Sequence, residues 1–184
     1  MENRNVVACA ESGQYWDADA EPAKCQNDSH EHRVFEAHRH LSPVVLPDGT
    51  QLTAASFYPV DPYSRPRDPD YGLYLDPCWQ PPWEHTYIDW PDFGVPADVQ
   101  SLLRTLSTVL DRARSGQAVE IGCIGGHGRT GTALACLAVL TGHPPGDAVA
   151  WVRSNYCTKS VETPRQQAFV AALFNSRAHD QPAG

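Results

Sequence analysis

Apolar residues follow a regular pattern in the second half of the chain. Over residues 97–115 they recur every three or four positions, which predicts an amphipathic helix, and Gly116 is a typical residue to end it. A short apolar strand, a glycine-rich turn and a more uniformly apolar helix follow. The elements predicted beyond Pro96 are a helix over 97–115, a strand over 118–122 and helices over 129–141, 147–155 and 164–176.

The first half of the chain is richer in proline and contains only short extended segments. An apolar run at 44–46, a Pro-Asp-Gly-Thr turn at 47–50 and the segment 51–58 together predict a β-hairpin. Further strands are predicted at 72–75 and 84–88. Strands followed by helices favour an α/β fold in which helices flank a central sheet.

Residues 1–41 are polar and show no periodicity. We expect a mobile N-terminal segment there, followed by one domain over 42–178 and a tail over 179–184. One cysteine and four histidines crowd part of this segment, a combination that can bind zinc: Cys25, His30, His32, His38 and His40. Because zinc ligands normally recur at short fixed spacings, we favour a His-rich segment without metal, and we expect no cofactor.

Length, composition and charge restrict the possible functions. The 184 residues suit one domain, and 41% hydrophobic with 20% charged residues is an ordinary globular composition. A net charge of −8 disfavours binding to nucleic acids and to anionic membranes. No signal peptide is recognisable, and the longest apolar run, 133–140, is far shorter than the roughly 20 residues of a membrane span. We therefore expect a cytoplasmic protein whose six cysteines are reduced.

The glycine-rich turn at 123–128 has the composition of an oxyanion site. Its glycines let the backbone curl with the N–H groups inward, and the following helix adds the positive end of its dipole. Arg129 can grip two phosphate oxygens, and Cys123 lies under the same N–H groups, which favours its thiolate. We predict Cys123 as nucleophile and substrate binding by Ile124, Gly125, Gly126, His127, Gly128 and Arg129.

Three other interpretations of this turn compete. The spacing Gly126-x-Gly128-x-x-Gly131 fits a dinucleotide-binding fingerprint, but no second strand ending in an acidic residue follows. A Walker loop needs lysine where Arg129 stands. A structural cysteine is the remaining alternative, but such a residue rarely faces the Arg-capped start of a helix. Phosphate binding beside a reactive cysteine is therefore favoured.

A second motif supplies the proton that a leaving group needs. Residues 90–96, Trp-Pro-Asp-Phe-Gly-Val-Pro, place Asp92 on a loop stiffened by prolines, with Trp90 and Phe93 as packing anchors and Gly94 as a pivot. Taken alone, this segment is an aromatic-anchored turn. Together with the cysteine turn, it predicts Asp92 as general acid.

The two motifs resemble those of the cysteine-dependent protein tyrosine and dual-specificity phosphatases. Cys123-x5-Arg129-Thr130-Gly131 is similar to their nucleophile loop, and residues 90–96 are similar to their mobile acid loop. The order, acid before nucleophile, is also theirs. The resemblance covers residues 85–176 and is that of a short bacterial-like member. It implies a mixed central sheet flanked by helices and hydrolysis through a phosphocysteine.

The resemblance also assigns roles to residues around the two loops. It implies that Thr130 stabilises the departing thiolate and that Gln166 or Glu162 orients the hydrolytic water. Gln166 has an alternative explanation, because it completes a capping box that begins at Thr163. His127 either adds positive charge at the mouth of the loop or is an exposed spectator.

Two residues depart from the family pattern, and the substrate stays open. Gly122 stands where the family usually has histidine, and Glu162 where it has glutamine. We predict phosphotyrosine in proteins as substrate, in a pocket that could be walled by Tyr63, Tyr71, Tyr74 or Trp79. A phosphoinositide or nucleotide substrate and phosphopeptide binding without turnover are the alternatives. Cys123 should be redox-sensitive, with a possible disulfide to Cys78, Cys136 or Cys157.

Overall fold

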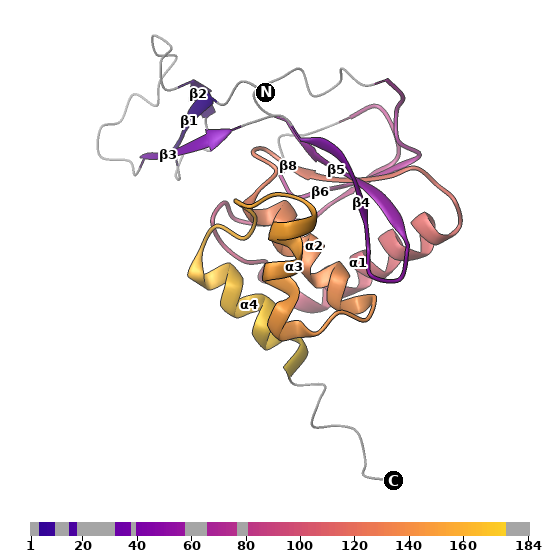
Figure 1. Cartoon of the computed structure of the whole chain (residues 1–184). Helices are drawn as coiled ribbons and strands as arrows, with labels where there is room; N and C mark the ends of the chain where they lie inside the picture. Colours follow the sequence, from indigo (N-terminus) through magenta and orange to yellow (C-terminus); the bar gives the residue numbers. More distant parts are fainter. Residues whose placement is uncertain are drawn as a thin grey trace.

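A mixed five-stranded sheet with helices packed against it forms the body of the protein (Figure 1). The computed structural model describes residues 4–9, 15–17, 32–37, 40–57, 66–76 and 81–175. The strands are β1 (Arg4–Cys9), β2 (Tyr15–Asp17), β3 (His32–Ala37), β4 (Leu41–Val45), β5 (Gln51–Ser56), β6 (Tyr71–Tyr74), β7 (His85–Tyr87) and β8 (Val119–Cys123). The helices are α1 (Val99–Arg114), α2 (Gly128–Leu140), α3 (Ala148–Asn155) and α4 (Pro164–Asn175), with a 3₁₀ turn η1 (Pro145–Asp147) before α3.

The strand order in the main sheet is β4-β5-β8-β6-β7. β4 and β5 form the antiparallel hairpin predicted from the sequence, and the turn between them places Gly49 at φ 88°. β8 runs parallel to β5 and to β6, and β6 runs parallel to β7. Parallel neighbours end at the same edge of a sheet, so residues that follow β5, β6 and β8 meet there.

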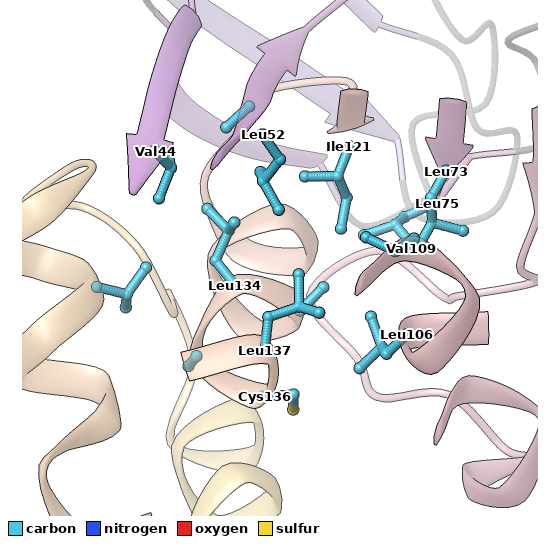
Figure 2. Packing of buried hydrophobic residues seen from close by; sticks show 14 of the residues in the cluster. Val44, Leu52, Leu73, Leu75, Leu106, Val109, Ile121, Leu134, Cys136 and Leu137 are labelled. Atoms are coloured by element: carbon cyan, nitrogen blue, oxygen red, sulfur yellow. The ribbon is translucent and has the colours of Figure 1, made fainter. Parts of the chain in front are cut away.

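The core lies between the sheet and the helices. Figure 2 shows Leu52 and Ile121 of the sheet directed toward Leu134 and Leu137 of α2. Every residue of β8 is buried, as expected of a central parallel strand covered on both faces. Cys136 lies in this core with no exposed surface, in the same cluster of buried residues as Cys123.

α1 confirms the most regular prediction. Asp98 caps its first turn by accepting a hydrogen bond from the Ser101 N–H at 2.8 Å, and Leu102, Leu106 and Val109 face the core. Gly116 follows its C-terminus with φ 88°, the left-handed conformation that glycine adopts without strain. Among the described residues, no helix is long and apolar enough to cross a bilayer.

The N-terminal segment contains strands that its sequence did not predict. β1, β2 and β3 form a separate antiparallel sheet in the order β2-β1-β3 within residues expected to be mobile. In that sheet Arg4 pairs with Ala37, a contact too distant along the chain for any local pattern to reveal. His40 is also 4% exposed rather than part of a mobile tail, while Cys25, His30 and His38 lie outside the described residues. The predicted tail over 179–184 lies outside them too.

Candidate active site

The predicted nucleophile is the last residue of the central strand, and the loop after it leads into a buried helix. Cys123 is the last residue of β8, and α2 begins at Gly128 after four intervening residues. The Phe57 N–H donates to the carbonyl oxygens of Cys123 and Ile124 at 3.2 and 2.9 Å, which fixes the start of the loop. Gly126 has φ 74°, so this turn requires glycine. The strand-turn-helix unit expected from the sequence is therefore present.

The thiol of Cys123 is enclosed. Its residue is 2% exposed, and the Thr130 hydroxyl donates to Sγ at 3.1 Å from the first turn of α2. Burial raises the pKa of this thiol; Arg129 and Thr130 oppose the effect, and Asp92 adds to it. This direction is opposite to the lowered pKa expected from the sequence, since desolvation and a facing carboxylate act against the loop's donors.

Arg129 is held by two carboxylates. Its Nη1 donates to Asp76 Oδ2 and to the carbonyl oxygen of Leu75, both at 3.0 Å, and to that of Trp90 at 3.3 Å. Its Nη2 lies 3.2 Å from Asp92 Oδ1. The arginine side chain is only 4% exposed, so these partners fix the direction of the guanidinium.

Asp76 is the functional residue that the sequence interpretation missed. It is 5% exposed and follows β6 at the carboxyl edge of the sheet, next to the end of β8. A signal was present, because an acidic residue directly after a predicted parallel strand lies where such folds place their sites.

The acid loop is a tight, anchored turn. Trp90 is 1% exposed and its indole N–H donates to the Gly94 carbonyl oxygen at 3.0 Å. Phe93 takes a positive φ of 55°, which is uncommon for a bulky residue, and its carbonyl oxygen accepts from the Thr163 hydroxyl at 3.2 Å. Asp92 lies between them with its side chain 29% exposed, so its carboxylate reaches both Arg129 and solvent.

Gln166 forms the predicted capping box. Its N–H donates to Thr163 Oγ1 at 3.2 Å, and its Oε1 accepts from the Thr163 N–H at 3.2 Å and from the Glu162 N–H at 2.9 Å. Its Nε2 is buried without a hydrogen-bond partner among the described residues. That nitrogen lies 3.0 Å from where a Cβ at Gly128 would be. The amide therefore also borders the loop over 123–129, called the phosphate loop below.

Glu162 also borders Gly128, and His127 lies next to Glu162. The Glu162 carboxylate accepts a hydrogen bond from the Gly128 N–H. Burial, together with the charge of Asp92, raises the pKa of Glu162 to about 7. His127 Nδ1 is 4.0 Å from Glu162 Oε1. His127 is 1% exposed and packs edge-on against His40, so it is not an exposed spectator, and it lines the candidate cavity.

Gly122 is required by packing. A Cβ at this position would lie 2.9 Å from the backbone oxygen of Ala55 and 2.9 Å from the ring of Phe57. A histidine here, as the family pattern has, would need the neighbouring strand to move. The departure at this position therefore follows from the close approach of β5 to β8.

The predicted groups share one small cavity of about 10 Å³, roughly the space of one water molecule. It is lined by Asp92, Phe93, Cys123, Ile124, Gly125, His127, Gly128, Arg129 and Glu162. A larger hollow of about 640 Å³ around Asp48 and Arg114 contains none of these groups. The smaller cavity is therefore the candidate active site, because nucleophile, acid and anion-binding loop converge only there among the described residues.

Two curated proteins of Methanocaldococcus jannaschii are similar to this chain. The uncharacterized protein MJECL20 is 36% identical over 91 residues, which are 50% of this chain and 60% of that protein. The uncharacterized protein MJ0215 is 37% identical over 84 residues, which are 46% of this chain and 51% of that protein. The matched part thus spans about half the length of these relatives.

Solved phosphatase structures share the fold. The active form of Tk-PTP aligns with a TM-score of 0.52 and 28% identity over 59% of this chain and 80% of its own. Kinase associated phosphatase, with its catalytic-site cysteine replaced by serine, aligns with a TM-score of 0.60 and 15% identity over 78% and 98% of the two chains. PTPMT1 in complex with PI(5)P aligns with a TM-score of 0.50 and 15% identity over 59% and 80%.

A family model covers both predicted motifs. Its description is Swiss Army Knife protein, DSP-PTPase phosphatase domain, and it matches residues 85–176, half of the chain. That region contains the acid loop, the phosphate loop and the capping box of α4. The chain therefore belongs to the family of DSP-PTPase phosphatase domains, within the superfamily of cysteine-dependent protein tyrosine and dual-specificity phosphatases.

Proposed function

We propose that this protein hydrolyses phosphate monoesters through a phosphocysteine, with phosphotyrosine in proteins as the favoured substrate. The observation that carries the proposal is the convergence of Cys123, Arg129 and Asp92 on one cavity. Thr130 lies 3.1 Å from the sulfur and Asp92 lies 3.2 Å from the guanidinium, so all four groups are within reach of one phosphoryl group. Family membership supports the same chemistry.

In the first step, Cys123 Sγ attacks phosphorus while the bond from phosphorus to the leaving oxygen breaks. The loop N–H groups and the Arg129 guanidinium bind the equatorial oxygens of the phosphoryl group. These positively polarised donors stabilise the negative charge on those oxygens. Asp92 donates its proton to the leaving oxygen, which departs as an alcohol or phenol. The products are a phosphocysteine and an ionised Asp92.

In the second step, water attacks the phosphocysteine. Asp92 takes a proton from that water, the bond between sulfur and phosphorus breaks, and the sulfur leaves as a thiolate. The Thr130 hydroxyl stabilises this thiolate, since it already donates to Sγ. The unpartnered Nε2 of Gln166 and the Glu162 carboxylate border Gly128, and both are in position to orient the water.

The charge of the chain and the lining of the cavity favour phosphotyrosine. A net charge of −8 disfavours anionic lipid surfaces, and Phe93, which borders the cavity, is suited to pack against a flat ring. Tyr71 and Tyr74 do not wall the cavity, because they are 3% and 0% exposed within the sheet. Tyr63 and Trp79 lie outside the described residues.

A phosphoinositide is the second candidate substrate, since PTPMT1, crystallised with PI(5)P, has a similar fold. In either case the partner is a phosphorylated molecule. The expectations of a cytoplasmic location, of no nucleic acid and of no membrane partner rest on charge and sequence alone.

The test is a substrate panel with purified full-length protein. Phosphate release from a phosphotyrosine peptide should exceed release from a phosphoserine peptide and from PI(5)P, and Cys123→Ser should abolish all three. Preferential release from PI(5)P would favour the lipid substrate. Phosphopeptide binding without phosphate release would favour the non-catalytic alternative, and turnover by Cys123→Ser would refute the mechanism.

A further inference from the structure

A cluster of metal-binding side chains lies behind the phosphate loop. His40, His127 and Cys157 are all buried, and their ligand atoms lie within 4.8 Å of one another. They come from three parts of the chain: the residue before β4, the phosphate loop and the residue after Tyr156 at the end of α3. We propose that these three residues form a zinc site that joins the phosphate loop to the N-terminal segment and to the α3–α4 connection.

The donor set suits zinc. Two imidazoles and one thiolate are a combination that zinc binds, with bonds of about 2.0–2.1 Å to nitrogen and about 2.3 Å to sulfur. Ligand atoms around one tetrahedral zinc are therefore about 3.3–3.6 Å apart. The three ligand atoms lie within 4.8 Å of one another, so shifts of roughly 1 Å would bring them to that geometry. The fourth tetrahedral position is left for water or a small anion.

Backbone hydrogen bonds fix all three residues in place. The His40 N–H donates to Ser56 Oγ at 2.8 Å, and the His40 carbonyl oxygen accepts from the Ser56 N–H at 3.0 Å. The His127 carbonyl oxygen accepts from the Gly131 N–H at 2.8 Å. The Cys157 carbonyl oxygen accepts from the Ser160 N–H at 3.0 Å. The backbone that carries each donor is thus set by the fold, which lowers the cost of ordering the three side chains around an ion.

The surroundings of the cluster also fit a metal centre. The Glu162 carboxylate lies 4.0 Å from His127 Nδ1, close to where a carboxylate orients a metal-bound imidazole. Tyr156 covers the ring of His40 at 4.8 Å between centroids, and its hydroxyl donates to the Gly126 carbonyl oxygen at 2.7 Å. A thiolate and this carboxylate together balance the charge of a divalent ion.

Of the cysteine and histidines that suggested zinc from sequence alone, His40 is the one that the described part of the chain places in this cluster. The other two ligands follow it by more than eighty residues, so no short ligand spacing announces the site. A zinc ion bound to the His127 side chain would restrict the motion of the phosphate loop, which carries the anion-binding N–H groups.

Metal binding by untagged full-length protein tests the proposal without any assay of phosphatase activity. Equilibrium dialysis against micromolar zinc should give one bound ion per chain, and cobalt in its place should show a thiolate-to-cobalt charge-transfer band. Cys157→Ser and His40→Gln should each weaken zinc binding about tenfold or more and abolish the zinc-dependent rise in melting temperature. Circular dichroism establishes that both variants fold.

Two variants serve as controls. Cys123→Ser removes the thiol of the phosphate loop and His143→Gln removes a histidine outside the cluster, and both should bind zinc like the unaltered protein. Full-length protein that binds no zinc would overturn the proposal, as would Cys157→Ser that binds it with unchanged affinity. Because Cys123→Ser separates metal binding from turnover, failure of the zinc site and failure of the phosphatase mechanism give different results.

Discussion

Replacing Asp76 with asparagine tests the ion pair that directs Arg129. The substitution keeps the size of the side chain and removes the charge that faces the guanidinium at 3.0 Å. Both side chains are almost fully buried, so solvent screens the pair weakly. Hydrogen bonds to charged groups contribute about 1.5–3 kcal/mol, and we expect Asp76→Asn to lower the free energy of unfolding by about that amount.

This estimate is smaller than the cost of removing a partner outright. Complete loss of one side of a buried pair costs about 3–5 kcal/mol, because the other charge is left uncompensated. Here Arg129 keeps the carbonyl oxygens of Leu75 and Trp90 and the carboxylate of Asp92. An asparagine oxygen can also accept from Nη1, so only the charge is lost.

The same substitution should reduce turnover. Asp76 fixes the guanidinium relative to Cys123, and a displacement of about 1 Å in a positioned group can reduce a rate about a hundredfold. We expect kcat/KM for an aryl phosphate to fall by about ten- to a hundredfold. Urea unfolding followed by tryptophan fluorescence and steady-state kinetics on the same preparation measure the two effects.

A surface pair provides the matched control. Asp48 lies 2.6 Å from Arg114, but the two side chains are 27% and 47% exposed. Such pairs contribute about 0–1 kcal/mol, so Asp48→Asn should change stability little and activity not at all. Asp76→Asn with the kcat/KM of the unaltered protein would refute the positioning role, as would an equal loss of activity in Asp48→Asn.

Three further predictions concern the acid loop, the thiol and the central strand. Asp92→Asn should lower kcat for aryl phosphates by about 10²–10⁴ through loss of the proton donor, and an unchanged kcat would exclude that role. Burial, together with Asp92, raises the pKa of Cys123, so iodoacetamide should alkylate it with a pH midpoint above that of a free thiol. Asp92→Asn should shift that midpoint downward, whereas the exposed Asp89→Asn should not; equal midpoints would contradict this. Gly122→Ala places a Cβ 2.9 Å from a backbone oxygen of β5 and should lower the free energy of unfolding, measured by urea titration, by about 1–3 kcal/mol. Gly146→Ala is the control, because its Cβ would have nothing within 4 Å and should leave stability unchanged. Equal stability of the two variants would contradict the packing argument.

The regular elements could be predicted because their signals are local. The apolar period over 97–115 and the Asp98 cap define α1 within two residues of its observed bounds. The turn at 47–50 likewise defines the hairpin, since Gly49 takes the positive φ that such turns need. The nucleophile loop and the acid loop were predictable for a similar reason, because each is a short contiguous motif.

The remaining parts of the site depend on contacts between distant residues. Asp76 meets Arg129 across 53 positions, and only the parallel pairing of β6 with β8 brings them together. His127 is buried because His40, from before β4, packs against its ring. No periodicity or motif around His40 or His127 indicates that the two rings meet. Composition alone therefore suggested a mobile N-terminal segment and an exposed loop histidine.

The raised pKa of Cys123 is compatible with its proposed role as nucleophile, because part of the increase comes from the negative charge of the facing Asp92. The first step needs a thiolate and a protonated Asp92, and this state contains as many protons as a thiol beside an ionised Asp92. Ionised Asp92 raises the pKa of the thiol, so a proton placed on Asp92 removes that effect. Arg129 and the Thr130 hydroxyl then remain to stabilise the thiolate. The alkylation midpoints of the unaltered protein and Asp92→Asn measure this coupling directly, since the variant removes the charge while leaving burial of the sulfur in place.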